Sequence, residues 1–112
     1  MKTISVARAI KASLKKIPGI VYAFIHDSGD LEDSAKEIDI LVVGGPDLEE
    51  MEEVISEVEK QLGRTIRISS FTVSEFRERM RAKNGFVSSL IPKEKLVLIG
   101  NENEMISHYR SN

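Results

Sequence analysis

Two short apolar runs constrain the fold of this chain more than any other feature. The runs are Ile20–Ile25 and Ile38–Val43, and each is nearly continuous, with no alternation of polar and apolar residues. Successive side chains of a strand point to opposite sides, so apolar residues occupy both sides of each run. The runs therefore predict strands that are buried on both faces, in a sheet covered by helices.

The segments around these runs alternate between helical and extended patterns. Apolar residues at helical spacing predict helices over Ser5–Lys16, Leu48–Leu62 and Val73–Ala82. Further strands are expected at Thr65–Phe71, which has the alternation of an edge strand, and at Leu96–Ile99. The expected order α-β-β-α-β-α-β describes an α/β (α+β) fold, with a mixed sheet of about four strands flanked by helices. Between the third helix and the last strand, Phe86–Leu90 is expected only as a short apolar piece.

Turn and capping residues stand between the expected elements. Breaker pairs and capping patterns are typical of the points where helices and strands begin or end. They are Pro18-Gly19, Gly44-Gly45-Pro46, Asp47 with Glu50, Thr72 with Glu75, and Asn84-Gly85.

The length and charge of the chain limit its organisation and partners. With 112 residues, it is expected to form a single domain over residues 1–112, with about 101–112 as a flexible polar tail. The 16 Lys and Arg against 18 Asp and Glu give a net charge of -2, which provides no general attraction for nucleic acid or anionic lipid. Direct nucleic-acid binding and membrane association are therefore not expected.

The absence of cysteine limits the chemistry further. A chain without cysteine has no disulfide framework, no thiolate metal ligands and no cysteine nucleophile. The N-terminal segment lacks a continuous signal-peptide core, because Arg8, Lys11 and Lys15 interrupt it. A cytoplasmic location is expected.

The most informative polar pattern is Glu37-Ile38-Asp39 at the head of the second apolar run. Residues i and i+2 of a strand point to the same face, so the two carboxylates are expected to lie side by side. Such a pair can share a Mg²⁺, a hard ion that takes oxygen ligands and keeps substrate phosphate oxygens in its shell. On spacing alone, an acid pair is more often simply the polar entry to a strand.

Several further segments join this pair in a longer pattern. They are Ile17-Pro18-Gly19-Ile20, Ile38-Asp39-Ile40-Leu41-Val42-Val43-Gly44, Gly63-Arg64, Ser74-Glu75-Phe76-Arg77-Glu78-Arg79, Phe86-Val87-Ser88-Ser89-Leu90 and Leu98-Ile99-Gly100. Over nearly the whole chain, this pattern resembles the minimal nucleotidyltransferases. It is closest to the branch of nucleotidyltransferase-like domains found next to winged-helix DNA-binding domains in prokaryotic regulators. The resemblance implies the nucleotidyltransferase fold.

The resemblance also implies where the nucleotide phosphates would be held. The family has a Gly-Ser pair at the end of the first strand, and the spacing back from Asp39 places Ile25-His26 there. A β-branched residue resists the positive φ that glycine allows where a backbone approaches phosphate. The loop's later glycine aligns with Asp30, beside Gly29, in a segment rich in acidic residues that would repel a nucleotide.

The metal-binding acids of the family are altered as well. The resemblance implies two strand aspartates, of which the second is kept as Asp39 and the first is replaced by Glu37. The third acid, expected on the following strand, aligns with Arg67, whose positive charge would oppose a second metal ion. These departures weigh against ordinary two-metal nucleotidyl transfer.

Other polar and aromatic residues have a simple alternative to a functional role. His26 could contact phosphate or a metal, although a lone histidine is more often a polar strand end. Arg64 could bind phosphate or support the helix end before it. His108 is expected to be solvated. We interpret Arg77, Arg79, Arg81 and Lys83 as a solvated basic face of a helix. We interpret Phe71, Phe76 and Phe86 as core or helix-docking residues.

Three hypotheses about function follow. In the first, the chain is a degenerate nucleotidyltransferase-fold domain that serves as a non-catalytic binding or regulatory module. The second is an active Mg²⁺-dependent nucleotidyltransferase that transfers a nucleotidyl group from an NTP to an unidentified acceptor, with Glu37 and Asp39 as metal ligands and His26 at the phosphates. The third is half of a toxin–antitoxin-like or regulator pair, with a separately encoded protein partner or DNA-binding protein. The expected edge strand also leaves room for a homodimer.

Overall fold

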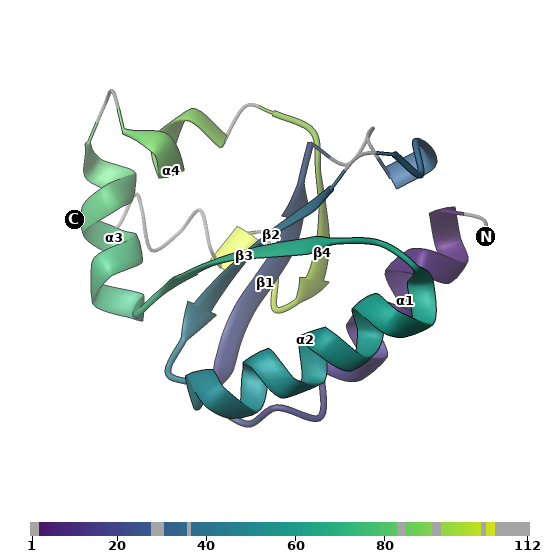
Figure 1. Ribbon diagram of the computed structural model, residues 1–112. Helices are drawn as coiled ribbons and strands as arrows, with labels where there is room; N and C mark the ends of the chain where they lie inside the picture. Colours follow the sequence, from purple (N-terminus) through teal and green to yellow (C-terminus); the bar gives the residue numbers. More distant parts are fainter. Residues whose placement is uncertain are drawn as a thin grey trace.

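The chain forms one mixed four-stranded sheet with helices on both faces (Figure 1). The computed structural model describes residues 3–27, 31–35, 37–82, 85–90, 93–101 and 103–104. In chain order the elements are α1 (Thr3–Leu14), β1 (Ile20–His26), β2 (Ile38–Gly44), α2 (Leu48–Leu62), β3 (Ile66–Phe71), α3 (Val73–Arg81), α4 (Phe86–Leu90) and β4 (Lys95–Ile99). The strand order is β3-β2-β1-β4; β2 and β3 are parallel, and the other neighbours are antiparallel.

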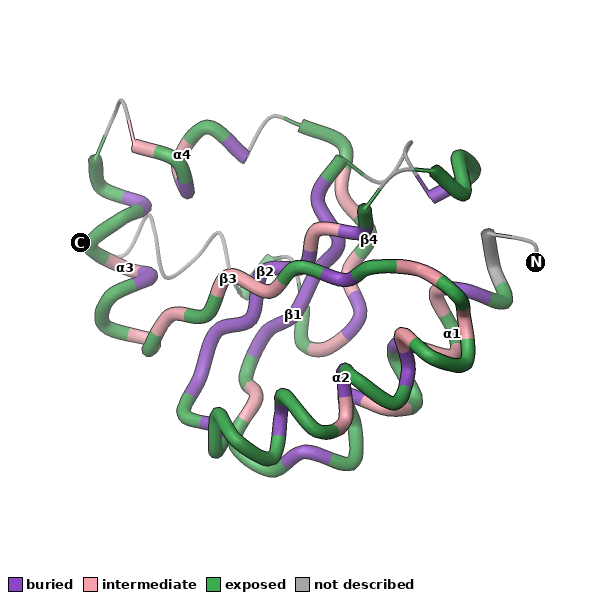
Figure 2. The backbone as a smooth tube through the Cα atoms, in the orientation of Figure 1, coloured by how far each residue is buried: buried purple, intermediate pink, exposed green. Residues whose placement is uncertain are grey.

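Each central strand contributes to two separate cores, as its apolar run predicts. In β2, Ile40 and Val42 pack with α1 and α2, whereas Leu41 and Val43 pack with α3 and α4. Figure 2 shows β1 and β2 buried over most of their length, while the edge strand β3 is only partly buried. The predicted fold class and the edge position of β3 are confirmed.

The predicted N-cap residues are confirmed at α2 and α3, and the predicted capping box is confirmed at α3. The Asp47 carboxylate accepts hydrogen bonds from the backbone N–H groups of Glu49 and Glu50. At α3, Thr72 and Glu75 form the complete reciprocal capping box. The hydrogen bond from the Thr72 backbone N–H, followed by that with the Thr72 hydroxyl, lowers the pKa of the Glu75 carboxyl.

One element differs from the prediction. Phe86–Leu90, expected as an apolar piece without assigned structure, forms the helix α4. Val87 and Leu90, three residues apart, are both buried against the α3 side of the sheet. The Ser88 hydroxyl donates to the Gly85 carbonyl at 3.0 Å, and the same carbonyl accepts the helical hydrogen bond from the Ser89 backbone N–H at 3.1 Å. The order of elements therefore contains one more helix than predicted.

Some predictions fall on residues outside the described part of the chain. These are the loop residues Gly29 and Asp30, the basic residue Lys83, Asn84 of the turn, and most of the tail, including His108. Within the described ranges, none of the helices has both the length and the apolar character needed to cross a membrane.

Candidate functional site

Three polar residues form a row across the sheet at one end of β1, β2 and β3. His26 in β1 is paired with Asp39 in β2, and Asp39 is paired with Arg67 in β3. Side chains of directly paired residues project from the same face, here the face covered by α3 and α4. Glu37 lies two residues before Asp39, directly before the first residue of β2.

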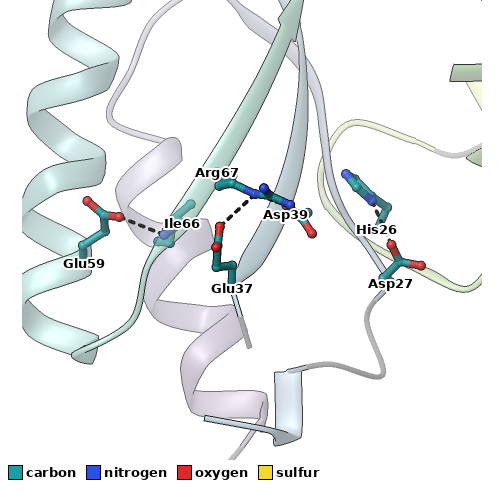
Figure 3. A network of polar contacts seen from close by, with 7 residues as sticks. All are labelled: His26, Asp27, Glu37, Asp39, Glu59, Ile66 and Arg67. Carbon is teal, nitrogen blue, oxygen red and sulfur yellow. Dashed lines mark hydrogen bonds and ion pairs between the residues drawn. The ribbon is translucent and has the colours of Figure 1, made fainter. Parts of the chain in front are cut away.

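The Arg67 guanidinium lies between the two carboxylates that the sequence predicts as metal ligands (Figure 3). Its Nε donates a hydrogen bond to Asp39 Oδ1 at 2.9 Å and forms an ion pair with Glu37 Oε2 at 2.8 Å. The hydrogen bond to Asp39, then the charge of Asp39 and the charge of Glu37, raise the pKa of Arg67. The arginine is therefore a fixed positive charge beside both acids.

This arrangement does not fit a Mg²⁺ ion shared by Glu37 and Asp39. Such an ion would lie about 2.0–2.1 Å from one oxygen of each carboxylate. The same oxygens already face a guanidinium nitrogen at 2.8 and 2.9 Å. The two acids are side by side as their spacing predicts, but the cation that they face belongs to the chain itself.

His26 is buried, although it ends its strand. The side chain is 8% exposed, and its Nδ1 lies 3.4 Å from Asp27 Oδ2. The Phe86 ring of α4 meets the imidazole edge-on, with 5.8 Å between the ring centroids. Of the residues predicted as core or helix-docking, Phe76 is buried in the core, whereas Phe86 is 53% exposed and is not a core residue. It covers the histidine, a role that its sequence position did not indicate.

These residues surround an open hollow of about 420 Å³. Its lining consists of His26, Asp27, Asp39, Arg67, Ile68, Ser69 and Phe86. Asp27, which the sequence marks only as one acid of the acidic segment after the first strand, has a φ of 56° and is the only non-glycine residue with positive φ in the described ranges. Aspartate tolerates this left-handed conformation better than most residues do.

Arg64 is not part of this hollow. Its two terminal nitrogens donate to the backbone oxygens of Leu31 at 2.7 Å and Asp33 at 2.9 Å. The side chain thus joins the segment that follows β1 to the end of α2. These contacts support a structural role, and sequence spacing alone could not reveal them because they join segments about 30 residues apart.

A second hollow, of about 400 Å³, lies between α2 and the edge strand β3. Its lining combines apolar residues, among them Leu48, Met51 and Ile68, with the polar residues Glu52 and Ser70. Glu59 also borders it, but one of its carboxylate oxygens accepts a hydrogen bond from the Ile66 backbone N–H at 2.8 Å (Figure 3). In the described residues, one group of three potential ligand residues, His26, Asp27 and Asp39, has its ligand atoms within 4.8 Å of one another, and it lies at the first hollow. We therefore take that hollow as the candidate functional site.

The fold matches solved toxin–antitoxin structures. One is a tri-AMPylated HEPN toxin from Shewanella oneidensis in complex with an MNT antitoxin, with a TM-score of 0.62, 12% identity, and coverage of 98% of this chain and 82% of that chain. A second is a toxin–antitoxin structure with AMP-PNP, with a TM-score of 0.61, 13% identity, and coverage of 94% of this chain and 82% of that chain. A third is a mutant of the MntA–HpeT toxin–antitoxin, with a TM-score of 0.57, 10% identity, and coverage of 99% of this chain and 83% of that chain. Neither a protein-family model nor a curated protein sequence matches the chain.

These matches define the class of fold. The chain has the nucleotidyltransferase fold, built on a four-stranded mixed sheet. More narrowly, its fold is similar to that found in toxin–antitoxin structures, one of which contains an MNT antitoxin. At 10–13% identity the likeness concerns the fold, and the function has to be argued from the site.

Proposed function

We propose that this MNT-like domain is a non-catalytic module that binds a partner protein. The observation that carries the proposal is the position of Arg67 Nε, 2.8 Å from Glu37 and 2.9 Å from Asp39. A guanidinium supplies the positive charge that these acids require, but it cannot coordinate phosphate oxygens as a metal ion does. In this role Arg67 stabilises the scaffold and leaves the site without its divalent ion.

The end of β1 supports the same proposal. Ile25 occupies the position where the family pattern has glycine, and its side chain is 1% exposed in the core beneath α1 and α2. This position therefore contributes to packing. His26 replaces the serine that would contact phosphate, and its ring is buried against Phe86. A triphosphate would find neither the open glycine backbone nor the small hydroxyl.

A protein partner is the third part of the proposal. The solved structures of similar fold are toxin–antitoxin systems, and one contains an AMPylated HEPN toxin together with its MNT antitoxin. By analogy, this domain would bind a separately encoded protein in the cytoplasm and control it by contact, without modifying it. The analogy supplies the kind of partner, and the Arg67 contacts supply the reason for expecting no modification.

The second candidate is an active Mg²⁺-dependent nucleotidyltransferase, which the side-by-side acids and the adjacent hollow favour. In this alternative Glu37 and Asp39 bind Mg²⁺, His26 contacts the phosphates of an NTP, and the nucleotidyl group passes to an acceptor on a partner. Arg67 would first have to leave both carboxylates. The two candidates differ in what happens to the partner.

Co-expression with the protein encoded next to this chain would test the proposal. We expect a complex that survives size-exclusion chromatography, and a partner whose intact mass stays unchanged after incubation with ATP and Mg²⁺. The Glu37→Gln/Asp39→Asn double variant should form the same complex, because binding would not depend on metal ligands. A partner that gains nucleotidyl groups with the wild type, and not with the double variant, would establish the enzyme instead. If no complex forms, the domain does not bind this neighbouring protein, and the proposed partner-binding function is wrong for it.

A further inference from the structure

We propose that His26, Asp27 and Asp39 form a binding site for a divalent transition-metal ion of the Zn²⁺ type. The site shares Asp39 with the Mg²⁺ position that the family pattern implies, but it lies on the β1 side of Asp39, where His26 is, and not on the side of Glu37. One ligand atom from each of the three residues lies within 4.8 Å of the others. The proposal concerns a different metal and a different ligand set from those of nucleotidyl transfer, and it is independent of whether a partner binds.

The spacing of the ligand atoms favours tetrahedral coordination. His26 Nδ1 and Asp27 Oδ2 are 3.4 Å apart. Two ligands on a tetrahedral Zn²⁺ with bonds of about 2.0–2.1 Å are separated by about 3.4 Å, whereas neighbouring ligands on an octahedral Mg²⁺ are separated by about 2.9 Å. The pair is therefore spaced for a tetrahedral ion, and the ligand atom of Asp39, which lies within 4.8 Å of both, would have to move closer to share it.

Backbone and packing hold the first two ligands in place. The His26 side chain is only 8% exposed, yet it borders the hollow, with Phe86 against its ring. Asp27 takes the left-handed φ of 56°, which returns its carboxylate toward the preceding histidine. An ordered imidazole costs less entropy to immobilise on a metal than a mobile one does.

Asp39 can serve both Arg67 and a metal. Arg67 donates to Oδ1 of Asp39, and the carboxylate has a second oxygen on its other side. Among the charged residues that line the hollow, the carboxylates of Asp27 and Asp39 outnumber the single cation Arg67. Outside the lining, Glu37 forms an ion pair with Arg67, and Lys95 is paired with His26 in β4. The Lys95 ammonium donates to the backbone oxygen of Lys93 at 3.4 Å. The remaining negative charge favours a divalent cation on the Asp27 side.

The donor set selects the kind of ion. Mg²⁺ takes oxygen ligands almost exclusively, while an imidazole nitrogen suits Zn²⁺, Fe²⁺, Co²⁺ or Ni²⁺. Three protein ligands leave a fourth position open for water or for a group from a partner. A metal at this position would give the buried histidine a function in addition to its contacts with Asp27 and Phe86.

Titration with Zn²⁺ alone would test this site, by calorimetry on the wild type and on Asp27→Asn. Asparagine retains the left-handed backbone conformation, so this variant should fold, with an unchanged far-ultraviolet circular dichroism spectrum. We expect binding of one Zn²⁺ in the wild type and at least about tenfold weaker binding in Asp27→Asn. His108→Gln, which removes the other of the two histidines of the sequence, is the matched control and should leave the affinity unchanged.

Nuclear magnetic resonance of the ring nitrogens gives a second readout. Addition of Zn²⁺ to the wild type should shift the Nδ1 signal of His26, while Mg²⁺ at the same concentration should not. Equal Zn²⁺ affinity in the wild type and Asp27→Asn, or a shift confined to the His108 ring, would overturn the proposal.

Discussion

Gly44→Ala is expected to destabilise the protein by about 3 kcal/mol or more, enough to lower Tm by more than about 10 °C. Gly44 ends β2 with a φ of 144°, a backbone conformation that L side chains rarely adopt. A Cβ there would lie 2.2 Å from the Gly19 oxygen and 2.9 Å from the Val21 nitrogen. Both are backbone atoms, so no side chain can rotate away, and the pairing of β1 with β2 would have to shift. Chemical denaturation of both proteins measures the difference.

Gly45→Ala is the matched control for this prediction. The same substitution one residue later alters the unfolded chain similarly, but a Cβ at Gly45 meets no atom within 4 Å. We expect a change within about 0.5 kcal/mol. Similar losses in the two variants would mean that the close approach of Gly19 and Gly44 does not limit the fold.

Substitution of Arg67 is expected to increase Mg²⁺ affinity stepwise. Arg67→Gln removes the positive charge beside Glu37 and Asp39, and Arg67→Asp also restores an acid where the family pattern has one. A unit charge about 4 Å from a divalent ion changes the binding free energy by about 2 kcal/mol even at the screening of water, which is roughly 30-fold in affinity. Arg67→Gln should therefore gain on the order of 30-fold over the wild type, and Arg67→Asp on the order of 1,000-fold. Titration calorimetry with Mg²⁺, at low ionic strength, measures the series.

Arg81→Gln provides the comparison for a general charge effect. Arg81 is exposed in the last turn of α3, and its substitution by glutamine removes the same unit of charge from the protein. Its substitution should leave Mg²⁺ affinity unchanged. If Arg67→Asp binds Mg²⁺ no better than the wild type, then Arg67 does not occupy the place of the metal, and the central argument about the site is wrong.

The fold was predictable because its signals are local and repeated. Ile20–Ile25 and Ile38–Val43 have no hydrophilic side, so only burial on both faces accommodates them. Thr72 with Glu75 marks the start of α3 within four residues. The helix α4 was missed because it is five residues long, too short for a periodic pattern to be recognised.

The site was predictable only in part. The spacing of Glu37 and Asp39 placed the two acids together, and Arg67 was recognised as a residue of the wrong charge. That its Nε contacts both acids depends on the parallel register of β2 and β3, which the sequence does not specify. The proximity of Asp27 to His26 depends on one positive φ, and the cover from Phe86 depends on the placement of α4.

If Arg67 takes the place of the metal, as we propose, then the domain does not bind nucleotides as an enzyme of this fold would. Thermal unfolding with each nucleoside triphosphate, with and without Mg²⁺, tests this claim most directly, on the wild type and on Asp39→Asn. A ligand at about 100 times its dissociation constant adds about 2.7 kcal/mol, or on the order of 10 °C for a chain of this size. We predict no Mg²⁺-dependent rise with any nucleotide; such a rise in the wild type, lost in Asp39→Asn, would contradict the claim and establish a working nucleotide site.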